Sequence, residues 1–311
     1  MDTQESGKGK AGPSAKDSAR DLSSLDASRD SLPGSSSKGH KDTTGALSPY
    51  HPFPTLMCTS ADWGQLMAFN LCGATPDDRL YLVEAHLGYS GKPPLGTRPG
   101  LLLHNGMSKN NPVLAAAGDK SQFAARAYSF CNDSLVLMPP LPDAGLSPAA
   151  DGGLVTEWLR ASVNGCKEVT FTFSIEVGNP LKEDVRRERF EWRKIEKGTN
   201  EAVKEGGYRL VAVEDASETG TEGTPAAGAS SSSSSPGTGG QYGVALLSWS
   251  KRLSTSRQVF RLELLGRGQS GELGERWSLM VVMTALRLWA MRIAGKTAKP
   301  IVSAGQKLAG K

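Results

Sequence analysis

The chain has 311 residues, of which 38% are hydrophobic and 22% charged, with a net charge of +4. Its four cysteines, Cys58, Cys72, Cys131 and Cys166, form neither a CxxC motif nor a His-Cys cluster, which argues against a disulfide framework and a zinc site. The first residues lack the apolar segment of a secretory signal. We therefore expect reduced thiols and a cytoplasmic location, with the nucleus or a peripheral membrane site as alternatives.

In chain order, the first expected element is a tail. Residues 1–47 are rich in Ser, Gly, Asp and Lys and contain no aromatic residue, and residues 216–240 contain a run of serines at 230–235. Such compositions cannot bury enough apolar area to offset chain entropy. We expect a disordered tail at 1–47 and a disordered, low-complexity insert at 216–240 within an ordered domain that spans 48–296.

Short strand patterns follow one another through this domain. In residues 168–177, Phe171 and Phe173 alternate with polar residues, and a strict period of two predicts one buried and one solvated face. Phe190 and Trp192 repeat this pattern within 187–194. The other expected strands are 79–87, 100–103, 112–116, 134–138, 154–159, 208–213, 242–250 and 258–265, with less certain strand signals at Met57 and 66–72. Evenly spaced antiparallel strands predict a sandwich or a barrel.

The last expected element is a helix at 275–294, which is apolar on almost every side. Such a helix either spans a membrane or is buried in protein. Its apolar stretch before Arg287 has only about ten residues, whereas a membrane span needs about 20, so we expect it inside the barrel. The expected core residues are Phe171, Phe173, Phe190, Trp192, Trp277 and Trp289. Residues 297–311 are expected to be a basic, flexible tail.

An all-β domain with one helix, in which about 10–12 antiparallel strands close around that helix, resembles the tubby C-terminal fold. That fold is shared by phospholipid scramblases and plant LURP-one-related proteins. Four segments carry a resemblance to an uncharacterised fungal tubby-like group: GLLLHNGMSKNNPVLAAAG (100–118), RERFEWRK (187–194), GGYRLV (206–211) and LGERWSLMVVMTALRLW (273–289). The resemblance covers about residues 50–295. It implies a module that binds phosphoinositides through basic residues on the barrel surface, although no individual residue can be carried over.

Basic residues gather towards the C-terminus, where residues 242–311 hold 12 Lys and Arg against three Glu. Unbalanced positive charge attracts anionic surfaces. Our candidate contacts for an anionic headgroup are Lys251, Arg252 and Arg257, in a predicted loop without acidic neighbours, together with Arg193 and Lys194. The plainer interpretation of the last two is a solvated strand face with cross-strand ion pairs.

Two other classes of function are alternatives to this binding module. The first is a membrane-inserted, scramblase-like or tail-anchored protein that uses helix 275–294. The second is an enzyme, but His86 and His104 have no accompanying metal ligands, and the glycine-rich loop 266–274 lacks the Walker lysine. We therefore expect a non-enzymatic protein with no cofactor and no metal. The expected partner is an anionic lipid or membrane surface; nucleic acid is disfavoured, protein partners are open, and the chain is expected to be a monomer.

Overall fold

The computed structural model describes residues 52–60, 67–120, 133–141, 153–163, 168–179, 184–195, 203, 206–213, 243–249 and 260–309. All of them belong to one unit of the chain, Leu47–Lys311. The tail expected at 1–47, the insert expected at 216–240 and three candidate contacts lie outside the described residues. These three contacts are Lys251, Arg252 and Arg257.

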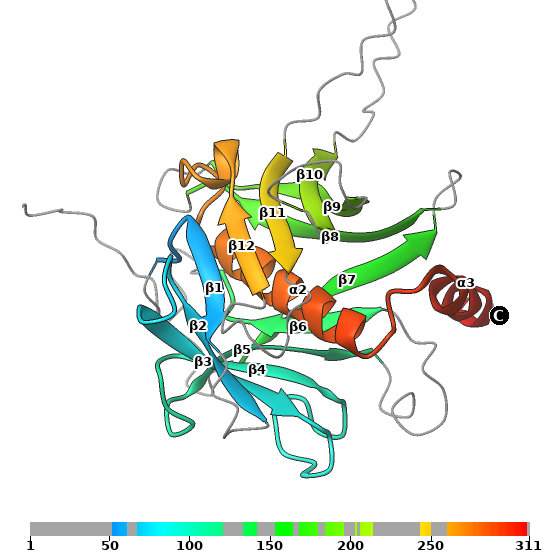
Figure 1. Cartoon of the computed structure of the whole chain (residues 1–311), viewed down its shortest axis with the longest axis horizontal. Coiled ribbons are helices and arrows are strands. Elements are labelled where there is room, and N and C mark those ends of the chain that lie inside the picture. Colours follow the sequence, from blue (N-terminus) through cyan, green and yellow to red (C-terminus); the bar gives the residue numbers. More distant parts are fainter. Residues whose placement is uncertain are drawn as a thin grey trace, which may run out of the picture. The chain divides into compact units, whose positions relative to one another are not determined.

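The described strands form a closed antiparallel barrel, in which each strand pairs with its neighbour in sequence and β1 pairs with β12 (Figure 1). This confirms the expected fold class of 10–12 strands around a C-terminal helix. The strands are β1 (Leu56–Ser60), β2 (Ala68–Cys72), β3 (Arg79–His86), β4 (Gly100–His104), β5 (Val113–Asp119), β6 (Ser134–Met138), β7 (Val155–Val163), β8 (Val169–Val177), β9 (Arg186–Ile195), β10 (Gly207–Val213), β11 (Gly243–Trp249) and β12 (Phe260–Leu264).

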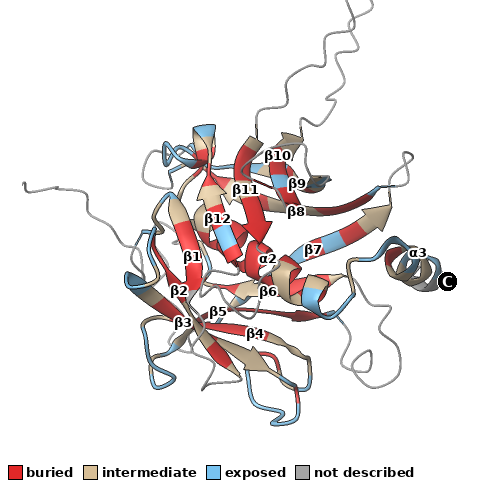
Figure 2. Ribbon diagram, viewed as in Figure 1, coloured by how far each residue is buried: buried red, intermediate tan, exposed pale blue. Residues whose placement is uncertain are grey.

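Helix α2 (Glu275–Ile293) runs inside this barrel, and most of its residues are buried (Figure 2). A wall of inward-facing strand side chains surrounds it, which explains why the helix is apolar on nearly all sides. Trp192 of β9 fixes the helix by donating its indole N–H to Thr284 Oγ1 at 3.1 Å. The alternative role of segment 275–294, a membrane anchor, would require this buried apolar surface to leave the barrel.

The beginning of α2 is held close to the end of β8. Gly274, the residue before the helix, has φ 84°, and a Cβ there would lie 2.5 Å from the carbonyl oxygen of Gly178. Only glycine accepts both this backbone conformation and this close approach. The contact places the first turn of α2, with Arg276, next to Glu176 at the end of β8.

Five of the six expected core residues are buried, with exposed fractions of 0–3%. Trp289 differs, because it is half-buried and packs edge-on against Phe69 and Phe260 at centroid distances of 5.1 and 6.1 Å. Its position near the C-terminal end of α2 turns it towards β2 and β12. It therefore does not join the aromatic cluster of β8 and β9.

The structure corrects the expectation for the C-terminal residues. Instead of a flexible tail, Lys299–Ala309 forms a second helix, α3, which follows α2. A short 3-10 turn, η3 (Gly266–Gly268), precedes α2. Val302 is fully buried, and the N–H of Val163 on β7 donates to Gln306 Oε1 at 3.2 Å. Val302 and Gln306 thus contribute to docking this short segment against the barrel, although its composition resembles a linker.

Candidate functional site

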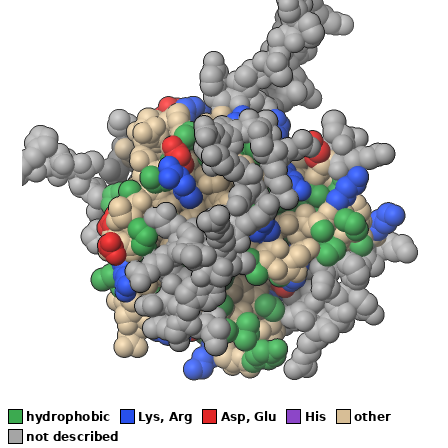
Figure 3. All heavy atoms as spheres, in the orientation of Figure 1, with side chains coloured by type: hydrophobic (Ala, Val, Ile, Leu, Met, Phe, Trp, Pro, Cys, Tyr) green, Lys and Arg blue, Asp and Glu red, His purple; other side chains and the backbone are tan. Residues whose placement is uncertain are grey.

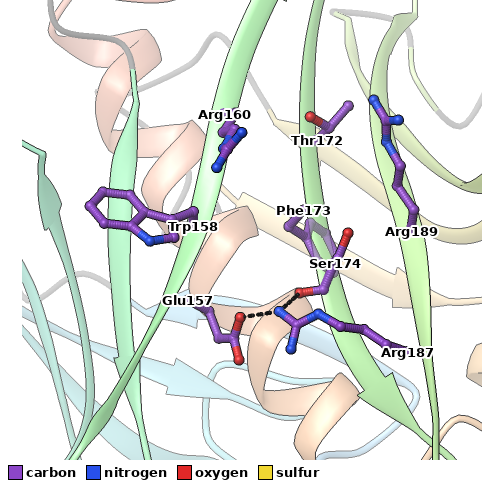
Figure 4. A pocket seen from close by; sticks show the side chains of 8 residues that line it. All are labelled: Glu157, Trp158, Arg160, Thr172, Phe173, Ser174, Arg187 and Arg189. Carbon is purple, nitrogen blue, oxygen red and sulfur yellow. Dashed lines mark hydrogen bonds and ion pairs between the residues drawn. The ribbon is translucent and has the colours of Figure 1, made fainter.

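Strand β7 changes partners halfway along its length. Its first half pairs with β6, from Val155↔Met138 to Leu159↔Ser134, whereas its second half pairs with β8, beginning at Arg160↔Thr172. Before Arg160, β7 and β8 therefore diverge in the barrel wall. A cleft of about 350 Å³ opens between them (Figure 4).

Three neighbouring strands line this cleft. Trp158 and Arg160 lie on the β7 side, Phe173 forms apolar surface on the β8 side, and Arg187 reaches in from β9 (Figure 4). The remaining lining residues are Glu157, Thr172, Ser174 and Arg189. Charged, hydroxyl and aromatic groups thus meet where the ladder between β7 and β8 ends.

Ion pairs close the inner side of the cleft. Glu157 is 7% exposed and accepts hydrogen bonds from Arg276 Nη2 of α2, at 3.1 Å, and from Arg187. Glu176 accepts from Arg276 Nε at 3.0 Å and also from Arg187. These four residues, which we call the open cluster, balance two positive charges with two negative charges.

The opposite charges of the open cluster stabilise one another, and the pKa values of Glu176 and Arg187 are shifted accordingly. Burial opposes ionisation of Glu176, but its own backbone N–H, Arg276 and Arg187 outweigh burial and hold the pKa of Glu176 below its ordinary value. Burial likewise opposes the charge of Arg187, and the bonds to Glu157 and Glu176 still raise its pKa. Both groups are therefore fully ionised near neutral pH.

Outside the open cluster, the outer face of β7–β10 carries three arginines that have no acidic partner among the described residues. Arg160, Arg189 and Arg209 are exposed, and none of them forms an ion pair with any residue that the structure describes. Arg193 is the direct cross-strand partner of Arg209, and its Nε donates to Glu191 Oε1 at 3.0 Å. Like charges directly opposite each other destabilise a sheet. Lys and Arg side chains also reach the surface near β7 and α3 at the right of Figure 3.

The structure describes two of the five expected headgroup contacts, Arg193 and Lys194. Arg193 lies on this basic outer face, and Lys194 is exposed at the next position of β9. Arg189 belongs to the basic segment 186–194 that also contains Arg193 and Lys194, whereas Arg160 and Arg209 are not among the expected contacts. Alternation along RERFEWRK already puts Arg187, Arg189 and Arg193 on one face of the strand, so this part of the signal was available. The contribution of Arg160 depends on the register between β7 and β8.

Comparison of the chain with protein-family models, curated proteins and solved structures finds no match. The resemblance to the tubby fold therefore stays a prediction. Of the helices that the structure describes, none combines the length and the apolar character required to cross a bilayer.

Proposed function

We propose that the protein is a non-enzymatic binding module whose outer face over β7–β10 binds anionic lipid headgroups at a membrane surface. The observation that carries the proposal is the set of three exposed arginines, Arg160, Arg189 and Arg209, that have no ion-pair partner among the described residues. Evenly balanced surfaces are the norm for a solvated strand face. Arginines without nearby acidic residues, held on the strands of the barrel wall, instead present a fixed positive field to an anion.

The magnitude of such an interaction is useful for a reversible membrane contact. Each Lys or Arg near an anionic surface contributes about 1 kcal/mol. Trp158, which is 37% exposed, lies on the same face, and tryptophan favours the boundary between headgroups and hydrocarbon. Several arginines beside one indole ring therefore give a surface suited to phosphate-bearing headgroups.

Sedimentation with lipid vesicles tests the proposal. The protein is mixed with phosphatidylcholine vesicles alone, or with vesicles that also contain phosphatidylserine or phosphatidylinositol bisphosphate, over a series of salt concentrations. We expect binding to anionic vesicles that weakens with salt, because exposed charges are screened. Replacing Arg189 and Arg209 with Ala should reduce the affinity roughly 30-fold, from about 1 kcal/mol per residue.

The matched control replaces two exposed basic residues on another part of the barrel, Arg79 and Lys92, with Ala. This variant has the same net charge as the Arg189/Arg209 variant. Equal losses of affinity in the two variants would show that binding depends on net charge alone and not on this face. The proposal would be overturned if the protein showed no salt-sensitive binding to any of the anionic vesicles.

A further inference from the structure

The divergence of β7 from β8 leaves backbone groups at the cleft edge. In an antiparallel strand, the N–H and C=O of one residue point to the same neighbouring strand, and successive residues alternate. The N–H groups of Ala161 and Val163 point to the β6 side, where they donate to Asp133 Oδ1 and Gln306 Oε1, both at 3.2 Å. Arg160 therefore faces β8, as its pairing shows.

Continuing this alternation backwards along β7 identifies the groups at the cleft. Trp158 and Thr156 have the same parity as Arg160, so their backbone groups point towards β8. The ladder between the two strands has ended at Arg160↔Thr172. The described part of the structure thus places an unpaired strand edge of β7 beside the cleft.

The opposite wall is partly closed by a side chain. The carbonyl of Ser174, which faces β7 by the same alternation, accepts a hydrogen bond from Arg187 Nη2 at 2.9 Å. An incoming strand would therefore pair with the main-chain groups of Thr156 and Trp158 on the β7 wall.

Charge and size restrict what such a strand can be. The edge from Val155 to Trp158 has four residues, which extend about 13 Å at 3.3 Å per residue. Arg160 and Arg189 flank the cleft on its outer side without ion-pair partners in the described residues, whereas Phe173, a core residue that is 3% exposed, lines its inner side. A matching strand has acidic side chains pointing outwards, towards these arginines, and uncharged apolar side chains on its other face, which meets Phe173 and the charge-balanced open cluster.

We infer that the cleft is a docking site for a short extended peptide with alternating acidic and apolar residues, which adds as a strand to the first half of β7. This is β-strand addition: main-chain hydrogen bonds give affinity and alternate side chains give specificity. The inference goes beyond lipid binding, because it depends on the backbone edge of β7 as well as on surface charge.

Fluorescence anisotropy with a labelled, acetylated hexapeptide Glu-Val-Glu-Val-Glu-Val tests the inference on the full chain. Two control peptides have the same sequence and charge but carry N-methyl groups on either the Glu or the Val residues. Each set of methyl groups removes the hydrogen-bond donors from one edge of the peptide. We expect the unmodified peptide to bind, and one of the two methylated peptides to bind at least tenfold more weakly.

Protein variants locate the site independently of the peptide chemistry. Arg160→Ala should weaken binding of the unmodified peptide several-fold, whereas Arg79→Ala should leave it unchanged. Unimpaired binding of both methylated peptides would overturn strand addition and indicate charge attraction alone. No binding of the unmodified peptide, or equal losses in the two variants, would overturn the inference as well. Vesicle sedimentation is a separate readout, so lipid binding and peptide binding can fail independently.

Discussion

Helix α2 carries two arginines on the same side, Arg276 and Arg287, and their ion pairs differ in how far they are exposed to solvent. Arg287 bonds to Asp119 and to Ser134 Oγ, the latter at 2.9 Å, and the side chains of Arg287 and Asp119 are 6% and 0% exposed. We call these three residues and Lys296, which bonds to Asp119 at 2.8 Å, the sealed cluster. Arg276 instead belongs to the open cluster, whose Arg187 side chain is 49% exposed.

The difference lies in how β7 is covered at each place. Near the sealed cluster, the edge of β7 at Ala161 and Val163 is capped by Asp133 and by Gln306 of α3. Near the open cluster, the edge at Trp158 faces the cleft. The two ion-pair clusters therefore differ in their surroundings. The sealed cluster is buried in the barrel interior, whereas the open cluster lies at the inner side of a cleft that solvent can enter.

The largest loss of folding stability is expected for a substitution in the sealed cluster. Asp119→Ala leaves Arg287 and Lys296 without their carboxylate, and an uncompensated buried charge costs about 3–5 kcal/mol. Urea unfolding measures the loss. Glu272→Ala, which breaks a pair that is 55% exposed on the Glu side, is the control and should cost at most about 1 kcal/mol. A loss for Asp119→Ala as small as that of the control would remove the distinction between the clusters.

A smaller effect is expected from the equivalent change in the open cluster. Glu157→Ala leaves Arg276 bonded to Glu176 and to the carbonyl of Pro139, and water can enter from the cleft. The loss should be about 1–3 kcal/mol, the usual penalty for removing one hydrogen-bonding partner. Urea unfolding beside Asp119→Ala gives the comparison. Equal or reversed losses in these two variants would contradict the assignment of open and sealed sites.

The cover provided by α3 can be weakened without touching a charge. Val302→Ala removes two methyl groups from a fully buried side chain, and at about 0.8 kcal/mol per methyl group the helix should dock less stably by about 1–2 kcal/mol. Hydrogen exchange of the Val163 amide, which α3 caps, should accelerate accordingly. Unchanged exchange at Val163 would show that α3 does not protect this edge.

The smallest expected effect concerns pH. Because the pKa of Glu176 is lowered in the folded protein, this residue stabilises the fold above its unfolded pKa of about 4.3, and the contribution is lost as the pH falls through the folded pKa. Glu176→Gln should therefore flatten the loss of stability in acid. Thermal unfolding between neutral and acidic pH measures it. Some dependence should persist, since Glu84 also has a lowered pKa. An unaltered slope would contradict a stabilising role of the ionised group.

Much of the wall and the helix could be predicted from the sequence, because local alternation determines them. Phe171 and Phe173 face inwards as their period of two indicates, and the interrupted apolar stretch of α2 correctly favours burial in protein. The clusters could not be predicted in this way. Arg287 and Asp119 are 168 positions apart in the sequence, and only the barrel closure brings them together. The cleft depends on where β7 changes partners, which strand propensity does not encode.

The proposed site shows the same division. The outward position of Arg193 follows from its own strand, whereas its like-charged partner Arg209 is set by pairing of β9 with β10. Helix α3 was missed because its small residues resemble a linker, and its stability depends on docking Val302 into the barrel.

The most direct test of the open edge is residue-resolved amide hydrogen exchange of β7 in the unliganded protein. The amide of Trp158 should exchange faster than that of Leu159, which pairs with Ser134 of β6, by on the order of a hundredfold or more, because an amide without a ladder partner needs no cooperative opening. Equal protection of Trp158 and Leu159 would mean that β7 has no open edge at the cleft, and the contrast between its two halves would be lost.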